Sequence, residues 1–220
     1  MATDTEKLVL GLAVAVGTAL LAFARRHGVS VPEPLPAWID LQVAGDDPTV
    51  RAEAELAKWQ GITETDSAAA PLLAAYWRAV GLPPQPPGTA WSAAFISAVA
   101  APAVAPSANH IGYARAAWKA RQQGTSGAYW AFQPHEAGPL QRGDIVLRGR
   151  GQPVSWADVV ADTGHRDSHG DIVTADRGAV LTRVGGNVSN SVRQTALPSG
   201  SVPANTFAVL RRPITLEAVA

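Results

Sequence analysis

Hydrophobic and polar positions follow two different spacings along the chain. Between residues 50 and 123 apolar side chains recur every three to four residues, which is typical of amphipathic helices. The predicted helices cover residues 50–59, 68–80, 91–99 and 110–123. Beyond residue 143 short apolar runs follow turn residues, which is typical of strands. The predicted strands cover residues 143–148, 171–174, 179–184 and 207–211. Helices followed by a small antiparallel sheet indicate an α+β fold.

The N-terminal region follows neither spacing. An uncharged run begins at Leu8 and ends at Ala24. As a helix it would be about 25 Å long, at the short end of what spans a ~30 Å hydrocarbon core. A signal peptide, a membrane anchor and a helix that packs within an assembly all fit this run, and we favour an uncleaved anchor or packing helix.

Four parts of the chain follow from these patterns. A hydrophobic helix is expected over 1–27, a proline-rich tether over 28–46, one domain over 47–213 and a short tail over 214–220. The third part has the usual length of a single domain with its own core.

Composition removes several classes of chemistry. The 220 residues contain 18 Lys and Arg against 18 Asp and Glu, so nucleic acid is not an expected partner. Cysteine is absent, which excludes disulfides, Cys-ligated zinc and thiol nucleophiles. No phosphate-loop pattern occurs, and we expect no cofactor. Any catalysis therefore relies on hydroxyl, carboxylate or imidazole groups.

Three polar residues lie where chemistry is expected. Ser92 opens an apolar helix after a proline-rich loop, and a helix N-terminus favours a developing anion. His169 lies where a polar turn meets a strand. Asn187 ends the next strand, about 4.8 Å away in an antiparallel sheet, where it could orient the imidazole. The competing interpretations are that Ser92 caps its helix and that the other two are turn residues.

Four motifs, in this order, carry a resemblance to a known family: WSAAFIS (91–97), GDIV (143–146), SHGDIV (168–173) and GGNV (185–188). Over residues 48–212 the chain resembles the NlpC-type and CHAP papain-like cell-wall peptidases. The closest likeness is to a bacterial branch of uncharacterised domains that often have Ser after the Trp. The resemblance implies a papain-like α+β domain behind the hydrophobic N-terminal helix.

The resemblance also implies roles for individual residues. In the family, a Cys at the helix start is the nucleophile, a His at the strand start is its base, and a polar residue on the following strand orients that His. By position these are Ser92, His169 and Asn187. A hydroxyl depends on its base far more than a thiol does.

Two functions remain open on this basis. The first is a peptidoglycan amidase or peptidase with a Ser-His-Asn arrangement. The second is a catalytically inactive module that binds peptidoglycan or has a structural role in an envelope or phage-like assembly. Both have a peptidoglycan or glycopeptide ligand and place the protein in the cell envelope, membrane-anchored or periplasmic, or in a phage-like particle. The segment from Leu8 to Ala24 would make the membrane or assembly contact.

Further residues are candidates for substrate contact. His110 opens a helix and could line the same cleft, with a capping role as the alternative. Trp91 could contact sugar or peptide, with core packing as the alternative. Asp171 is also assigned to substrate binding.

An acid–imidazole cluster gives a third hypothesis. Asp167, His169 and Asp171 alternate on one strand face, and Asp162 and His165 are nearby. Metal-dependent hydrolysis would use such ligands, but their spacing matches no zinc pattern, and it ranks below the first two functions. The segment Gly149-Arg150-Gly151 indicates only a turn. The discriminating measurement is the distance from Ser92 to His169, for which about 2.6–3.2 Å supports a dyad.

Overall fold

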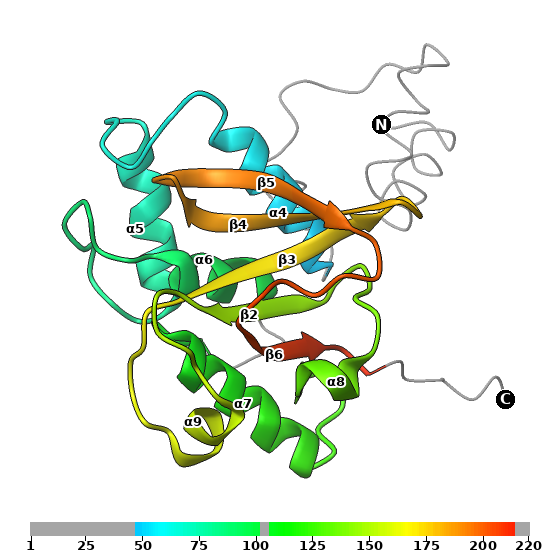
Figure 1. Ribbon diagram of the computed structural model, residues 1–220. Helices are drawn as coiled ribbons and strands as arrows, with labels where there is room; N and C mark the ends of the chain where they lie inside the picture. The colour runs from blue at the N-terminus through cyan, green and yellow to red at the C-terminus, as the bar shows by residue number, and fades with distance from the viewer. Residues whose placement is uncertain (1–46, 102–105, 214–220) are drawn as a thin grey trace, which may run out of the picture.

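The computed structural model describes residues 47–101 and 106–213, and these form an α+β fold (Figure 1). The helices are α4 Pro48–Lys58, α5 Ala69–Ala79, α6 Ser92–Ala100, α7 His110–Gln122, α8 Pro134–Ala137 and α9 Trp156–Ala161. The strands are β1 Trp130–Phe132, β2 Ile145–Gly149, β3 Ser168–Asp176, β4 Val180–Val188, β5 Ser191–Pro198 and β6 Thr206–Arg211. The predicted α+β class is confirmed.

The N-terminal run that begins at Leu8, the tether over 28–46 and the tail over 214–220 lie outside the described residues. Across 47–101 and 106–213, none of the helices combines the length and the apolar character that crossing a bilayer requires.

All six strands form one antiparallel sheet in the order β1-β6-β2-β3-β4-β5. The four predicted strands correspond to the four central strands, β6, β2, β3 and β4. The edge strands β1 and β5 were not predicted, and neither were α8 and α9. β1 has three residues, and most side chains of β5 are at least partly exposed, so neither carries an apolar run.

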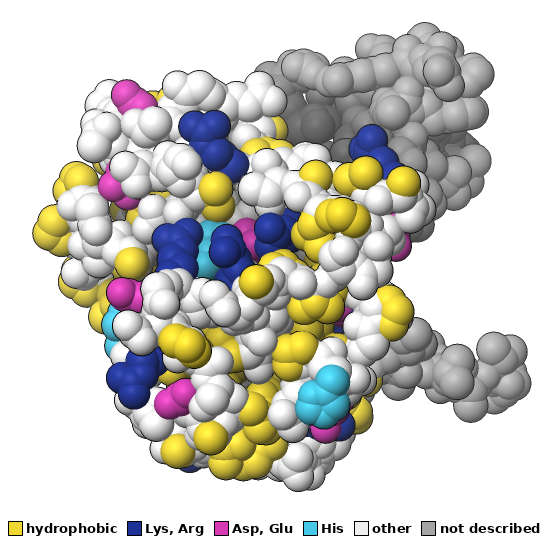
Figure 2. Space-filling view, viewed as in Figure 1, with side chains coloured by type: hydrophobic (Ala, Val, Ile, Leu, Met, Phe, Trp, Pro, Cys, Tyr) yellow, Lys and Arg dark blue, Asp and Glu magenta, His cyan; other side chains and the backbone are white. Residues whose placement is uncertain are grey.

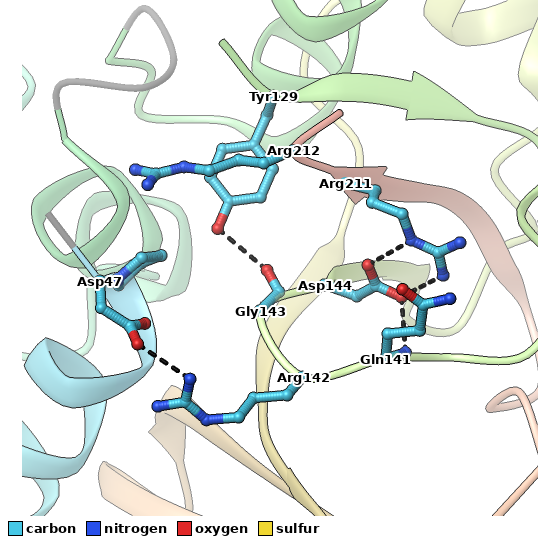
Figure 3. Close-up of a pocket in the computed structure, with 9 residues that line it drawn as sticks. Asp47, Tyr129, Gln141, Arg142, Gly143, Asp144, Arg211 and Arg212 are labelled. Carbon is cyan, nitrogen blue, oxygen red and sulfur yellow. Dashed lines mark hydrogen bonds and ion pairs between the residues drawn. The ribbon is translucent and has the colours of Figure 1, made fainter. Parts of the chain in front are cut away.

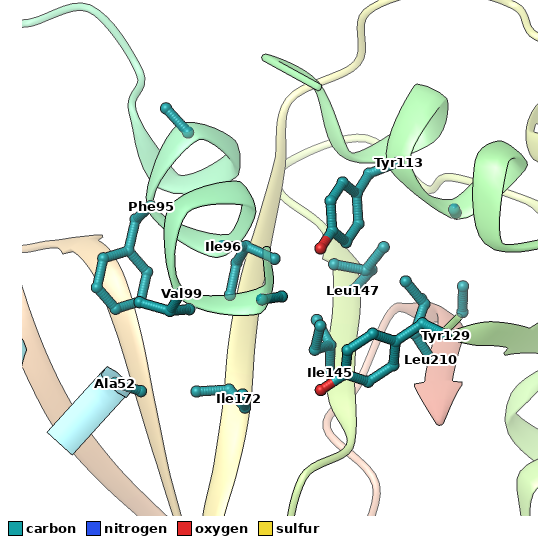
Figure 4. Close-up of a cluster of buried hydrophobic side chains, with 14 of the residues drawn as sticks. Ala52, Phe95, Ile96, Val99, Tyr113, Tyr129, Ile145, Leu147, Ile172 and Leu210 are labelled. Carbon is teal, nitrogen blue, oxygen red and sulfur yellow. The ribbon is translucent and has the colours of Figure 1, made fainter. Parts of the chain in front are cut away.

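Alternate side chains of the central strands enter two separate cores. Ile145, Leu147 and Ile172 pack with side chains of α4, α6 and α7 (Figure 4). Val146 and Val173 belong to a smaller cluster that includes Ala137 of α8. This alternation follows from the two-residue period of a strand. It leaves the N-terminal half of β3 with helix α6 on one face and the buried polar side chains of His169 and Asp171 on the other.

Candidate functional site

Helix α6 is fixed by its apolar surroundings. Seven of its side chains besides Ser92 are buried. Just before it, the Trp91 ring stacks on Trp59 with 4.9 Å between centroids, and its Nε1–H donates to Glu64 Oε2 at 2.8 Å. Trp91 is only 1% exposed. The structure therefore places Trp91 in the core and not against a ligand, because the aromatic stack and the buried carboxylate enclose it.

Ser92 is brought against His169. The Ser92 Oγ lies 3.1 Å from His169 Nδ1, inside the range that supports a dyad. It also accepts a hydrogen bond from the Gly170 N–H at 3.2 Å. The N-cap of α6 is Trp91, which makes no side-chain capping bond, so Ser92 does not cap its own helix. A Cβ at Gly170 would lie 2.9 Å from Ile96, so the glycine lets α6 approach β3 this closely.

Asp171 lies behind the imidazole. His169 Nε2 and Asp171 Oδ1 are 2.8 Å apart, and Asp171 Oδ2 accepts from Arg183 Nη1 at 2.7 Å. Asp171 is 1% exposed, so it does not contact substrate as expected but holds the histidine. Gly185 is its cross-strand partner, and a Cβ there would overlap the Asp171 carboxylate. The first glycine of the GGNV motif thus makes room for this carboxylate.

Asn187 differs from its expected place. It has φ +60° beside a register shift between β4 and β5, and its backbone carbonyl accepts a 3.3 Å bond from Arg150. The position is that of a turn residue, which Asn tolerates well. The role expected for Asn187, bonding the second imidazole nitrogen, belongs to Asp171. The sequence did contain a signal for this contact, because His169 and Asp171 are two residues apart and therefore share one face of a strand.

Arg150, which the sequence indicated only as a turn residue, reaches the base. Its Nη2 lies 2.8 Å from His169 Nδ1. A guanidinium can only donate hydrogen bonds, so Nδ1 presents its lone pair and Nε2 carries the proton that is donated to Asp171. His169 is therefore a neutral imidazole whose Nδ1 lone pair faces both Arg150 and Ser92.

Burial and the surrounding charges keep the His169 imidazole neutral. Burial lowers the pKa of His169; the Asp171 bond and charge oppose this, but Arg150 and Arg148 add to the lowering, and the pKa stays below its ordinary value. Burial alone would raise the pKa of Asp171. The hydrogen bond from His169 and the charges of Arg183 and Arg148 outweigh it, and the pKa is lowered. The site thus holds a neutral base beside an ionised carboxylate.

A cleft of about 300 Å³ opens in front of Ser92. It is lined by Ala90, Ser92, Ala93, Ala108, Asn109, His110, Arg150, Gly151, His165, Asp167 and Ser168. On the face shown in Figure 2, several Lys or Arg side chains gather around a histidine and an acidic side chain near the start of β3.

His110 lines this cleft, as the sequence predicted. Ser168 donates its hydroxyl to the Arg166 carbonyl at 2.9 Å, so its Oγ accepts from His110 Nδ1–H at 3.0 Å. Burial lowers the pKa of His110 to about 3. His110 is therefore a neutral wall of the cleft and not a cation.

The first turn of α6 supplies backbone N–H donors to the site. The leading N–H groups of a helix have no partner within the helix, and Ser92 and Ala93 both line the cleft. Such donors suit the oxyanion that forms when a nucleophile attacks a carbonyl. A hydroxyl, a neutral base, an ionised carboxylate and backbone donors together fit acyl transfer.

The acid–imidazole cluster does not assemble. His165 and Asp167 are well exposed, whereas the His169 side chain is 0% exposed. Across the part of the chain that the structure describes, no three side chains of the metal-binding types converge on one point. The geometry gives no support to metal ligation by these residues.

A second cavity, of about 340 Å³, lies near the start of α4 (Figure 3). Arg211 binds both oxygens of Asp144, at 2.6 and 2.8 Å, and Arg142 binds Asp47 at 2.9 Å. Tyr129 donates its hydroxyl to the Gly143 carbonyl at 2.9 Å. None of the described residues that line it is a serine or histidine. The aspartate of the GDIV motif therefore supports a turn.

Comparison with known proteins gives a match to a family model. A family model described as "Uncharacterized protein conserved in bacteria (DUF2272)" matches residues 50–208. That range includes all the residues placed around Ser92 and His169. Neither curated proteins nor solved structures gave a match to the chain.

Proposed function

The chain belongs to the bacterial family described as "Uncharacterized protein conserved in bacteria (DUF2272)", and from the geometry of its cleft we propose that it is a serine hydrolase of cell-wall peptidoglycan. The observation that carries the proposal is the continuous chain Ser92–His169–Asp171, at 3.1 and 2.8 Å. The substrate class comes from the resemblance of its motifs to NlpC-type and CHAP peptidases.

Each residue has one role in the proposed reaction. Ser92 Oγ attacks an amide carbonyl while His169 Nδ1 takes its proton. Asp171 stabilises the imidazolium, and the N–H groups of Ser92 and Ala93 stabilise the oxyanion. The imidazolium then gives its proton to the departing amine, and water hydrolyses the acyl-enzyme by the same base. Relative to the usual serine triad, the two imidazole nitrogens exchange partners.

The expected location follows from the substrate. Hydrolysis of peptidoglycan places the protein in the cell envelope or in a phage-like particle. The apolar run that begins at Leu8 is consistent with the first of these, and it lies outside the described residues.

Digestion of purified muropeptides tests the mechanism. We expect Ser92→Ala and His169→Ala to abolish product formation, because one removes the nucleophile and the other its base. Ser97→Ala is the matched control: it removes another buried hydroxyl from α6, one that bonds Ser107 and not His169. Equal activity of Ser92→Ala and wild type would refute a serine mechanism.

One observation favours the alternative, a non-catalytic peptidoglycan-binding module. Arg150 lies closer to His169 Nδ1 than Ser92 does, 2.8 against 3.1 Å, and the nitrogen has a single lone pair. While Arg150 holds it, Ser92 has no base. A Ser92→Cys variant separates the two functions, because a thiol is partly ionised without a base. Muropeptide cleavage by Ser92→Cys alone would favour a cleft that has lost turnover.

A further inference from the structure

Arg150 is a cation without an anion in its hydrogen bonds. Arg150 is an exposed residue that lines the cleft, and within the described chain its guanidinium donates to the His169 ring and the Asn187 carbonyl, both of them neutral. Burial and the neighbouring charge of Arg148 lower the pKa of Arg150. Neither hydrogen-bond partner carries a negative charge, so the guanidinium can take an anionic ligand from the cleft.

The residues around Arg150 also carry more positive than negative charge. Arg148 lies opposite His169 in the register of β2 and β3, and Arg183 reaches the same carboxylate from β4. Three guanidinium groups therefore share one buried carboxylate, that of Asp171. Arg148 approaches it only to 3.9 Å, and its Nε is buried without a hydrogen bond in the described structure.

The other carboxylate of the cleft does not correct the imbalance. Asp167 lines the cleft, but its side chain is 86% exposed and pairs with His165 at 3.9 Å. A solvated carboxylate contributes little to the energy of a neighbouring cation. The cleft in front of Ser92 thus remains electropositive.

We propose that Arg150 is the receptor for a carboxylate of the substrate, and that binding this carboxylate releases His169 to Ser92. The guanidinium fork matches two carboxylate oxygens, and a charged pair is stronger than a bond to a neutral imidazole. When Arg150 turns to the carboxylate, its bond to Nδ1 breaks, and the Ser92 hydroxyl becomes the only donor to that lone pair.

This inference deepens the proposed function by naming its substrate class. The preferred ligand is a peptide with a free carboxylate close to the scissile amide, as stem peptides of peptidoglycan have. A neutral ligand of the same shape would leave Arg150 on the base. The release of His169 rests on the proposed hydrolase function, whereas the carboxylate site does not.

Binding to an inactive protein tests the site independently of turnover. The probes are a synthetic stem tetrapeptide with free carboxyl groups and the same peptide with every carboxyl amidated, titrated calorimetrically into Ser92→Ala. We expect the free form to bind about tenfold more tightly or better, the usual gain from a hydrogen bond to a charged group. In Ser92→Ala/Arg150→Gln this preference should largely disappear.

Arg121→Gln in the Ser92→Ala background is the matched control. Arg121 is another partly exposed arginine, but it lies on α7 and is paired with Glu136 at 3.0 Å. It should leave the preference intact. Equal affinity for the two peptides, or a preference that survives Arg150→Gln, would overturn the proposal.

Turnover by variants that retain Ser92 tests the second part of the proposal, the release of His169 to Ser92. Arg150→Gln should lower kcat/KM for the free peptide and leave or raise it for the amidated one, whereas a general loss of structure would lower both. Arg150→Lys, which keeps the charge without the fork, should recover part of the preference. If wild type cleaves neither peptide, the hydrolase proposal fails, and the titration still decides the carboxylate site.

Discussion

Asp144, just before β2, and Asp171, in β3, are both buried beside arginines, but their surroundings differ. Near α4, Asp144 is bound through both oxygens by Arg211, and the neighbouring Arg142 has Asp47 as its partner (Figure 3). Beside α6, Asp171 divides its oxygens between Arg183 and the neutral His169. The first arrangement is closed, because each of these charges has its counterpart inside the protein.

The second arrangement is open at both ends. At one end Arg150 lies against a base instead of an acid, and at the other the Ser92 hydroxyl faces a cleft. A buried carboxylate is thus weak evidence for function by itself. What distinguishes a site is a carboxylate whose hydrogen bonds lead through a neutral base to a reactive group that lines a cleft.

The largest effect is expected where the open arrangement is broken. In Asp171→Asn an amide can donate to His169 Nε2 and turn the imidazole to the tautomer with its proton on Nδ1, where Ser92 needs a lone pair. We expect muropeptide turnover per folded molecule to fall about 10⁴-fold, the usual loss when a triad carboxylate becomes an amide. Turnover within tenfold of wild type would show that Asp171 is not part of the mechanism.

Asp144→Asn should affect stability instead. It leaves the Arg211 guanidinium without its anion in a largely buried pair, and such losses cost about 3–5 kcal/mol. Urea unfolding measures the free energy, and turnover corrected for the folded fraction should stay at the wild-type rate. A cost below about 1 kcal/mol, or a specific loss of turnover, would remove the contrast between the two aspartates.

The predictable parts of the structure are those with local signals. The apolar period places the four long helices and the central strands, and the start of a helix and of a strand identify Ser92 and His169. Their 3.1 Å contact joins residues 77 positions apart, and only the ordered motifs indicated it. The missed elements, such as the edge strand β5, have too few buried side chains to produce a pattern.

The partners of His169 could not be predicted in the same way. The spacing placed Asp171 on the histidine's strand face, but its orientation depends on Gly185 of β4, whose missing side chain leaves room for the carboxylate. Arg150 lies in a turn between two glycines, where an arginine gives no periodic signal. Asn187 was assigned from strand adjacency, and the register shift beside it overrides that argument.

The two buried histidines of the site, His110 and His169, predict how the stability of the protein depends on pH. Burial lowers the pKa of His110 to about 3 and that of His169 below its ordinary value. Both therefore bind protons mainly in the unfolded chain, and stability should fall as pH decreases below about 6.5, by up to about 1.4 kcal/mol per pH unit for each. Above that pH neither contributes a slope.

His110→Gln isolates one of these contributions, since glutamine keeps a donor for Ser168. Its free energy of unfolding in urea, measured from pH 7 down to pH 4.5, should fall less steeply than that of wild type. Superimposable pH dependences would mean that His110 is not held neutral in the folded protein.

The smallest effect is expected at the exposed pair of the closed arrangement. Arg142 and Asp47 are 50% and 39% exposed, so water already solvates both charges. Arg142→Ala also removes a bond from Nε to the Thr174 carbonyl, but it leaves Asp47 as the N-cap of α4 through its bond to the Thr49 N–H. We expect a loss below about 1 kcal/mol in urea unfolding, and a smaller one in high salt, which screens such pairs. A salt-independent loss above about 2 kcal/mol would instead make Arg142 as integral to this region as Arg211, because exposed pairs do not reach that magnitude.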